Sequence, residues 1–166
     1  MTQALPSELA DALRARGWRM ATAESCTGGM IAAACTDLAG SSDWFERGFV
    51  TYSNAAKCEL LGVQAALIEA HGAVSEPVAR GMALGARAKA PVDLSVAVTG
   101  VAGPAGGSAA KPVGTVWLAW CTADSVWAER CLFAGDRAAV RRATVVRALQ
   151  GLLALATGQS PTNEVT

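Results

Sequence analysis

Hydrophobic residues recur every three or four positions in several stretches of the chain, as they do on the buried face of an amphipathic helix. This spacing predicts helices over residues 5–16, 30–35, 54–61, 64–71 and 76–89, and a long last helix that begins after Asp136. Gly17 and Gly62 directly follow two of these stretches, where glycine commonly ends a helix. Ser75 is placed to cap the helix over residues 76–89.

Short runs of β-branched, aromatic and other apolar residues lie between these helices and predict strands at residues 18–23, 45–52 and 94–99. Residues 113–122 and 126–134 predict a hairpin, and residues 100–112, with four glycines and two prolines, predict a loop. Strands that alternate with helices and end in a hairpin indicate a layered α/β domain with a mixed sheet. We place this single domain at residues 1–157 and expect residues 158–166 to form a polar, disordered tail.

The composition narrows the class of protein. A chain of 166 residues that is 52% hydrophobic and 17% charged is too apolar for disorder. Lysine plus arginine and aspartate plus glutamate both number 14, and the resulting zero net charge argues against nucleic acid or a membrane surface as partner. No apolar run reaches the length of a membrane span and no secretion signal is visible, so we expect a cytoplasmic protein.

The metal-ligating residues are few and scattered. The chain has five cysteines without a C-x-x-C pair and one histidine, so no zinc-site spacing can be written. We therefore expect no metal and no cofactor. The hydrophobic content is compatible with a homodimer.

The first candidate for chemistry is Ser25, which lies between a predicted strand and a predicted helix in the segment E-S-C-T-G-G. Backbone N–H groups at the start of a helix have no partner inside the helix, and such donors can hold a developing oxyanion. Gly28 and Gly29 would let the backbone come close to a substrate. The alternative is that Ser25 or Thr27 only caps the helix.

A serine nucleophile needs a base, and Lys57 is one candidate. Lys57 follows Tyr52, the only tyrosine, across a strand-to-helix corner. Burial lowers the pKa of a lysine, so a buried Lys57 could accept a proton, with Tyr52 orienting it or relaying the proton. The alternative is a surface lysine beside a core tyrosine. His71, the only histidine, is a second candidate base, but it lies near a helix C-terminus, where cationic residues are common.

Two segments could hold a phosphate or a ribose. The glycine-rich loop over residues 100–107 follows a buried strand and would expose N–H groups, although it matches neither a Walker A loop nor G-x-G-x-x-G. Arg137 begins the last helix, with Arg141 and Arg142 one turn further on. The alternatives are a plain surface loop and a solvated stripe of arginines.

Seven motifs occur in one order along the chain: A-E-S-C-T-G-G at 23–29, G-S-S at 40–42, F-E-R-G-F-V-T-Y-S-N with a lysine at 45–57, G-A-V-S-E at 72–76, T-G-V-A-G-P at 99–104, K-P-V-G-T-V at 111–116 and G-D-R at 135–137. Together they resemble the CinA C-terminal domain family from about residue 7 to residue 155. The resemblance implies a three-layer α/β/α domain. It also implies hydrolysis of the carboxamide of nicotinamide mononucleotide to nicotinate mononucleotide and ammonia, in salvage of pyridine nucleotides.

The resemblance further implies that Ser25 is the nucleophile and that Tyr52 and Lys57 assist it. We expect the substrate to be held by residues of the same motifs: Glu24, Thr27, Gly28, Gly29, Thr99, Gly100, Gly103 and Arg137. Two alternatives stay open. The chain could be a nucleotide-binding regulatory module without catalysis, or an amidase acting on another carboxamide with a phosphate tail.

Overall fold

A computed structural model describes residues 3–163. Its centre is a mixed sheet of five strands in the order β2-β1-β3-β4-β5. The strand bounds are β1 Met20–Glu24, β2 Phe45–Val50, β3 Leu94–Gly100, β4 Thr115–Cys121 and β5 Val126–Leu132. β1 pairs in parallel with both β2 and β3, whereas β4 runs antiparallel to β3 and β5. The mixed sheet predicted from the sequence is therefore confirmed.

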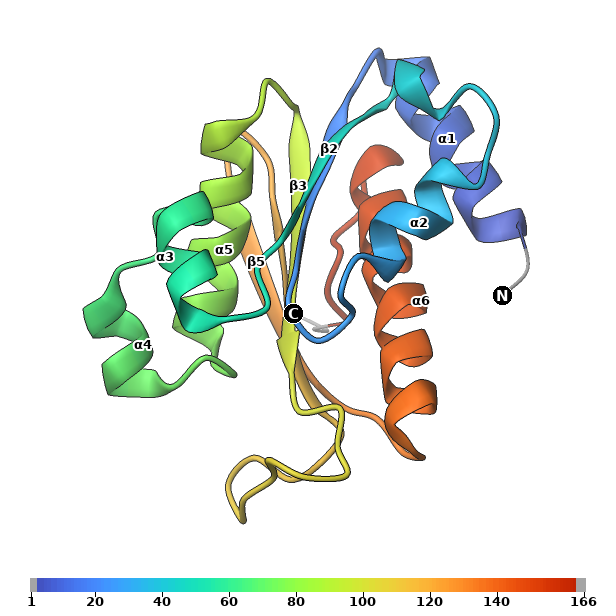
Figure 1. Cartoon of the computed structure of the whole chain (residues 1–166). Helices are drawn as coiled ribbons and strands as arrows, with labels where there is room; N and C mark the ends of the chain where they lie inside the picture. Colours follow the sequence, from blue (N-terminus) through green and yellow to red (C-terminus); the bar gives the residue numbers. More distant parts are fainter. Residues whose placement is uncertain (1–2, 164–166) are drawn as a thin grey trace.

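Helices cover both faces of the sheet, which gives the expected three layers (Figure 1). One face carries α1 Ala4–Arg16, α2 Met30–Thr36 and α6 Arg137–Ala156. The other side carries α3 Asn54–Leu61, α4 Ala65–His71 and α5 Glu76–Lys89. A short 3-10 turn, Ser41–Asp43, precedes β2. None of the helices within residues 3–163 is long and apolar enough to cross a bilayer.

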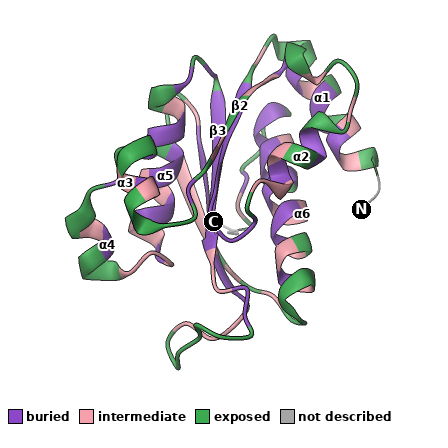
Figure 2. Cartoon of the chain, viewed as in Figure 1, coloured by how far each residue is buried: buried purple, intermediate pink, exposed green. Residues whose placement is uncertain are grey.

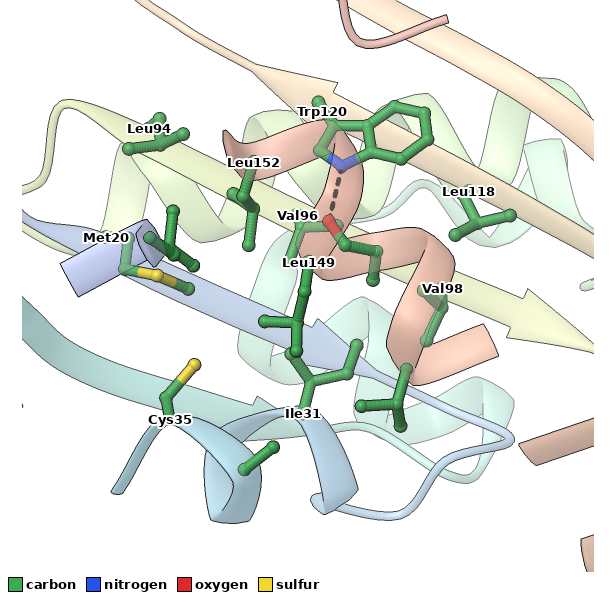
Figure 3. Packing of buried hydrophobic residues seen from close by; sticks show 14 of the residues in the cluster. Met20, Ile31, Cys35, Leu94, Val96, Val98, Leu118, Trp120, Leu149 and Leu152 are labelled. Carbon is green, nitrogen blue, oxygen red and sulfur yellow. Dashed lines mark hydrogen bonds between the residues drawn. The ribbon is translucent and has the colours of Figure 1, made fainter. Parts of the chain in front are cut away.

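The buried residues lie in the two spaces between the sheet and its helices (Figure 2). Because side chains alternate along a strand, Val96 and Val98 of β3 pack on the side of α6, and Ala97 packs on the side of α5. Trp120 of β4 lies in the first space, and its indole N–H donates to the backbone oxygen of Ala148 on α6 at 3.1 Å (Figure 3). A Cβ at position 151 of α6 would lie 2.2 Å from the Trp120 ring, so this contact requires Gly151.

Most predicted elements agree with the structure to within two residues, and the differences have local causes. The first strand begins at Met20 rather than Trp18, because the Trp18 N–H donates to Leu13 and completes the end of α1. Ser75 does precede α5, but its hydroxyl donates to the Gly72 oxygen at 2.8 Å and does not cap the helix.

The end of the chain differs from the prediction. Pro161 is buried, and its backbone oxygen accepts a hydrogen bond from the side chain of Arg147. The Asn163 N–H donates to the carboxylate of Glu129 at 3.1 Å. Residues 158–163 therefore pack against α6 and β5, and the expectation of a disordered tail is wrong for them. The remaining residues, 164–166, lie outside the described part of the chain.

Candidate active site

The candidate residues meet at one edge of the sheet. β1, β2 and β3 run in parallel, and β5 runs the same way because two antiparallel pairings separate it from β3. Their carboxyl ends therefore lie at a common edge, where α/β proteins usually bind ligands. A cavity of about 280 Å³ lies there. It is lined by Ser25, Cys26, Tyr52, Asn54, Lys57, Ala73, Val74, Thr99, residues 100–103, Ala105, Gly106 and Arg137.

Ser25 and Lys57 form a buried pair in this cavity. The Lys57 Nζ atom lies 3.0 Å from the Ser25 Oγ atom, and the residues are only 1% and 8% exposed, respectively. Lys57 lies in the first turns of α3, which Ser53 caps by accepting from the Ala56 N–H. Lys57 is thus not a surface lysine. The Ser25 hydroxyl bonds to the lysine rather than to the start of α2, so the capping alternative is wrong for Ser25.

The surroundings of Lys57 suit both protonation states. Its Nζ atom also lies 3.1 Å from the backbone oxygen of Thr51 and 3.3 Å from that of Tyr52. An ammonium can donate to all three oxygens, whereas a neutral amine can donate to the two carbonyls and accept the proton of Ser25. Burial lowers the pKa of Lys57 below that of a free lysine.

The neighbouring thiol of Cys26 does not oppose this shift at neutral pH. Burial raises the pKa of the Cys26 thiol to about 12, so the thiol carries no negative charge there that would favour the ammonium. Within residues 3–163 no carboxylate lies within 4 Å of the Lys57 Nζ atom. The arrangement can therefore accept and return a proton.

Glu24 has a different position from the one the sequence suggested. Glu24 is the last residue of β1, and it is buried. Its carboxylate accepts from the Thr27 hydroxyl at 2.6 Å and from the N–H groups of Ile31 and Ala32 at 2.8 and 3.1 Å. Glu24 thus caps α2 from outside the helix. An acceptor at a helix start also offsets the positive end of the helix dipole.

The other residues of this turn also shape the backbone. Thr27 is fully buried against Glu24. Gly28 and Gly29 have φ angles of 58° and 105°, which favour glycine, and they turn the chain from β1 into α2. None of these four residues, Glu24 included, lines the cavity. The side chains of Glu24 and Thr27 therefore bond to each other and, for Glu24, to the start of α2, and they do not face the cavity.

The same turn keeps two backbone donors free beside Ser25. The Ser25 N–H donates to the Val98 oxygen, and the Gly28 N–H donates to the Ser25 oxygen, both at 3.1 Å. Across the described chain, the N–H groups of Cys26 and Thr27 donate to no acceptor of another residue. An unpaired donor next to a serine hydroxyl is an element of an oxyanion hole, and of these two residues Cys26 is the one that lines the cavity.

Tyr52 lies at the rim of the cavity and not in the core. It is 60% exposed, and its hydroxyl accepts from Arg137 at 3.0 Å. Arg137 also donates to the Gly103 oxygen at 2.9 Å, which ties the glycine-rich loop to the start of α6. Tyr52 reaches Lys57 through its backbone oxygen and not through its hydroxyl. The guanidinium of Arg137 thus connects the loop to the tyrosine.

A second cavity, of about 610 Å³, adjoins the first. Ala102 and Arg137 line both cavities, and Arg141 and Asp136 belong to the larger one. The Asp136 side chain caps α6 by accepting from the Ala139 N–H at 2.8 Å. Arg137 therefore stands between a small cavity with the serine–lysine pair and a wider one that is open to solvent.

From the sequence, no ligand contact is expected for Ala73 and Val74, which belong to the motif at residues 72–76. The Thr99 hydroxyl donates to the Ala73 oxygen at 3.0 Å, and this bond holds Ala73 and Val74 in the cavity wall. His71 is exposed at the end of α4, and its backbone oxygen accepts from Lys111 at 2.7 Å. His71 does not line the cavity and cannot serve Ser25 as a base.

The three-layer fold and the Ser25–Lys57 pair define an α/β protein with a serine–lysine site in the wall of a small cavity. The chain belongs to the CinA C-terminal domain family, whose sequence model matches residues 2–156. Among the described residues, no three histidine, cysteine, aspartate or glutamate side chains gather as they would around a metal ion.

Curated relatives and solved structures agree with this membership. The chain is 56% identical over 150 residues to the nicotinamide-nucleotide amidohydrolase PncC of Enterobacter agglomerans, covering 90% of this chain and 92% of that protein. It is 56% identical over 153 residues to the protein of the same name from Pseudomonas putida, covering 92% and 96%. The crystal structure of the competence/damage inducible protein CihA from Agrobacterium tumefaciens superposes with a TM-score of 0.90 at 44% identity, covering 92% of this chain and 94% of that one.

Proposed function

We propose that this protein is a nicotinamide-nucleotide amidohydrolase, which converts nicotinamide mononucleotide to nicotinate mononucleotide and ammonia in pyridine nucleotide salvage. The observation that carries the proposal is the buried contact of 3.0 Å between Lys57 Nζ and Ser25 Oγ at the floor of a small cavity. The relatives with the name of this activity match about nine-tenths of the chain, so the whole domain is shared with them.

The reaction begins when Ser25 Oγ attacks the carboxamide carbon while Lys57 Nζ takes the hydroxyl proton. The carbonyl oxygen becomes an oxyanion, which the free N–H group of Cys26 in the cavity wall stabilises. The C–N bond then breaks, and the leaving nitrogen takes the proton from Lys57 and departs as ammonia. An acyl ester on Ser25 remains. Water adds to this ester with Lys57 as base, and Ser25 recovers its proton as the nicotinate product leaves.

The two cavities suggest how the substrate lies. The small cavity has a wall of Ala73, Val74 and Val101, which suits the flat nicotinamide ring. The ribose phosphate would then extend toward the larger cavity and Arg137, with Gly100 and Gly103 at the boundary. An arginine fork is well suited to a phosphate. The zero net charge of the chain fits a substrate bound by local charges, and we expect a cytoplasmic enzyme, as a homodimer, without nucleic acid.

The direct test is release of ammonia from nicotinamide mononucleotide, with nicotinate mononucleotide identified as the second product. Nicotinamide and nicotinamide riboside are the matched controls, since they lack the ribose phosphate and the phosphate, respectively. Binding of nicotinamide mononucleotide without release of ammonia would favour a regulatory module. Release of ammonia only from another phosphate-bearing carboxamide would change the substrate but not the reaction.

A further inference from the structure

Arg141 of α6 reaches back to the turn that carries Ser25. Its Nε atom donates to the backbone oxygen of Cys26 at 3.1 Å, and its second terminal nitrogen donates to the backbone oxygen of Thr27 at 3.2 Å. Arg141 is 115 positions from Cys26 and 114 positions from Thr27 along the chain. A guanidinium is a rigid planar fork, so it can hold two adjacent carbonyl groups in one orientation.

The orientation of these carbonyls fixes the free donors beside Ser25. The oxygen of Cys26 and the N–H of Thr27 belong to one planar trans peptide, so they point in opposite directions. Arg141 holds that oxygen on the side of α6 and thereby directs the Thr27 N–H away from α6. In the same way, the Gly28 N–H holds the Ser25 oxygen and directs the Cys26 N–H.

We propose that Arg141 is a positioning residue, which acts through the backbone of Cys26 and Thr27 to keep the oxyanion hole in place. The positive charge at the Thr27 carbonyl also polarises the Thr27–Gly28 peptide, which strengthens the bond from the Gly28 N–H to the Ser25 oxygen and so helps to fix the direction of the Cys26 N–H. Two of the guanidinium nitrogens of Arg141 already donate to the backbone oxygens of Cys26 and Thr27. Arg141 therefore acts on the oxyanion hole rather than as a ligand of the phosphate. The inference rests on the proposed amidohydrolase function.

The test compares Arg141→Met with Arg142→Met, which changes the next residue, exposed and outside both cavities. Arg141→Met should lower kcat by about tenfold to a hundredfold, because loss of an oxyanion-hole donor costs about a hundredfold or more. KM should stay within about twofold, and kcat should fall equally for nicotinamide mononucleotide and nicotinamide riboside. Arg142→Met should keep the wild-type kcat.

Chemical rescue separates positioning from a loss of folding. Millimolar guanidinium chloride should restore part of the kcat of Arg141→Ala, whereas urea, which is uncharged, and sodium chloride should not. If Arg141→Met and Arg141→Ala melt far below the wild type, Arg141→Lys provides the measurement, since an ammonium can bond only one carbonyl well and should give an intermediate kcat.

Two results would overturn the inference. One is an unchanged kcat in a folded Arg141→Met, and the other is a rise in KM confined to nicotinamide mononucleotide, which would make Arg141 a phosphate ligand. Both require an active wild type. A wild type that releases no ammonia would instead contradict the proposed function.

Discussion

The amine of Lys57 lies 3.0 Å from the hydroxyl of Ser25, across 32 residues of sequence. Two parallel strands create this contact. Ser25 directly follows β1 and Lys57 lies on the helix after β2, and the pairing of Glu24 with Val50 brings the ends of both strands to the same level. The helix cap at Ser53 then fixes the start of α3. The lysine is therefore oriented by the fold before any substrate arrives.

The first prediction concerns the nucleophile. Ser25→Ala should reduce turnover of nicotinamide mononucleotide by orders of magnitude, because it removes the attacking oxygen. Stability should fall by only about 1 kcal/mol, since one hydrogen bond to Lys57 is lost. Ser125→Ala, in the exposed turn between β4 and β5, is the matched control and should keep full activity. Residual turnover above about a tenth of the wild type would remove Ser25 from this role.

The second prediction concerns the base. Lys57→Arg keeps the charge but has no neutral form near neutral pH, so it should be almost inactive if Lys57 takes the proton of Ser25. Tyr52→Phe should be only partly impaired, because the tyrosine hydroxyl bonds to Arg137 and the tyrosine reaches Lys57 through its backbone. Steady-state kinetics of the two variants give the comparison. An active Lys57→Arg with an inactive Tyr52→Phe would assign the base to the tyrosine.

The third prediction uses the lowered pKa of Lys57. Unfolded Lys57 binds its proton up to about pH 10.4, whereas burial weakens proton binding in the folded state. The unfolded chain therefore holds more protons between the two pKa values, and wild-type stability falls as pH drops from about 10 through the folded pKa. Lys57→Met has no titrating amine at this position, so its stability does not fall for this reason. Its Tm relative to the wild type should rise as pH falls through that window and level off below it.

Lys89→Met is the control for this measurement, because Lys89 is exposed at the end of α5. Its Tm difference from the wild type should not change over the same pH range. A Tm difference for Lys57→Met that is equally flat would show that burial does not lower the pKa of Lys57. The activity of the wild type should agree with the stability data, with an acid limb in kcat/KM whose midpoint lies below that of a free lysine.

The fold and the serine–lysine pair could be predicted from the sequence, but the role of the turn residues could not. Helical and strand periodicities place Ser25 and Lys57 just after two consecutive strands, and the motifs that resemble the CinA C-terminal domain family mark both as site residues. The direction of the Glu24 side chain depends on the pleat of β1 and on where α2 returns, which no local pattern encodes. Likewise, a pattern shows Arg141 only as one of several arginines, and its bonds to Cys26 and Thr27 depend on how α6 packs.

The fourth prediction tests the structural role of Glu24. Glu24→Gln replaces one of the two carboxylate oxygens by an NH2 group, so either the Ala32 N–H, or the Ile31 N–H together with the Thr27 hydroxyl, loses its acceptor. The free energy of unfolding should fall by about 1–3 kcal/mol, measured by urea denaturation. Glu69→Gln, on the exposed side of α4, should leave it unchanged. A stable Glu24→Gln variant with a raised KM would restore the substrate-binding role that the sequence suggested.

The last prediction concerns the phosphate. Arg137 lines both cavities and already donates to Gly103 and Tyr52, so its charge lies where a ribose phosphate would leave the small cavity. Hydrogen bonds to a charged group contribute about 1.5–3 kcal/mol, so Arg137→Ala should raise KM for nicotinamide mononucleotide by roughly tenfold to a hundredfold. KM for nicotinamide riboside should change much less, because this substrate has no phosphate to lose. Equal rises in KM for both substrates would show that Arg137 acts only by holding the Gly103 loop and Tyr52 in place.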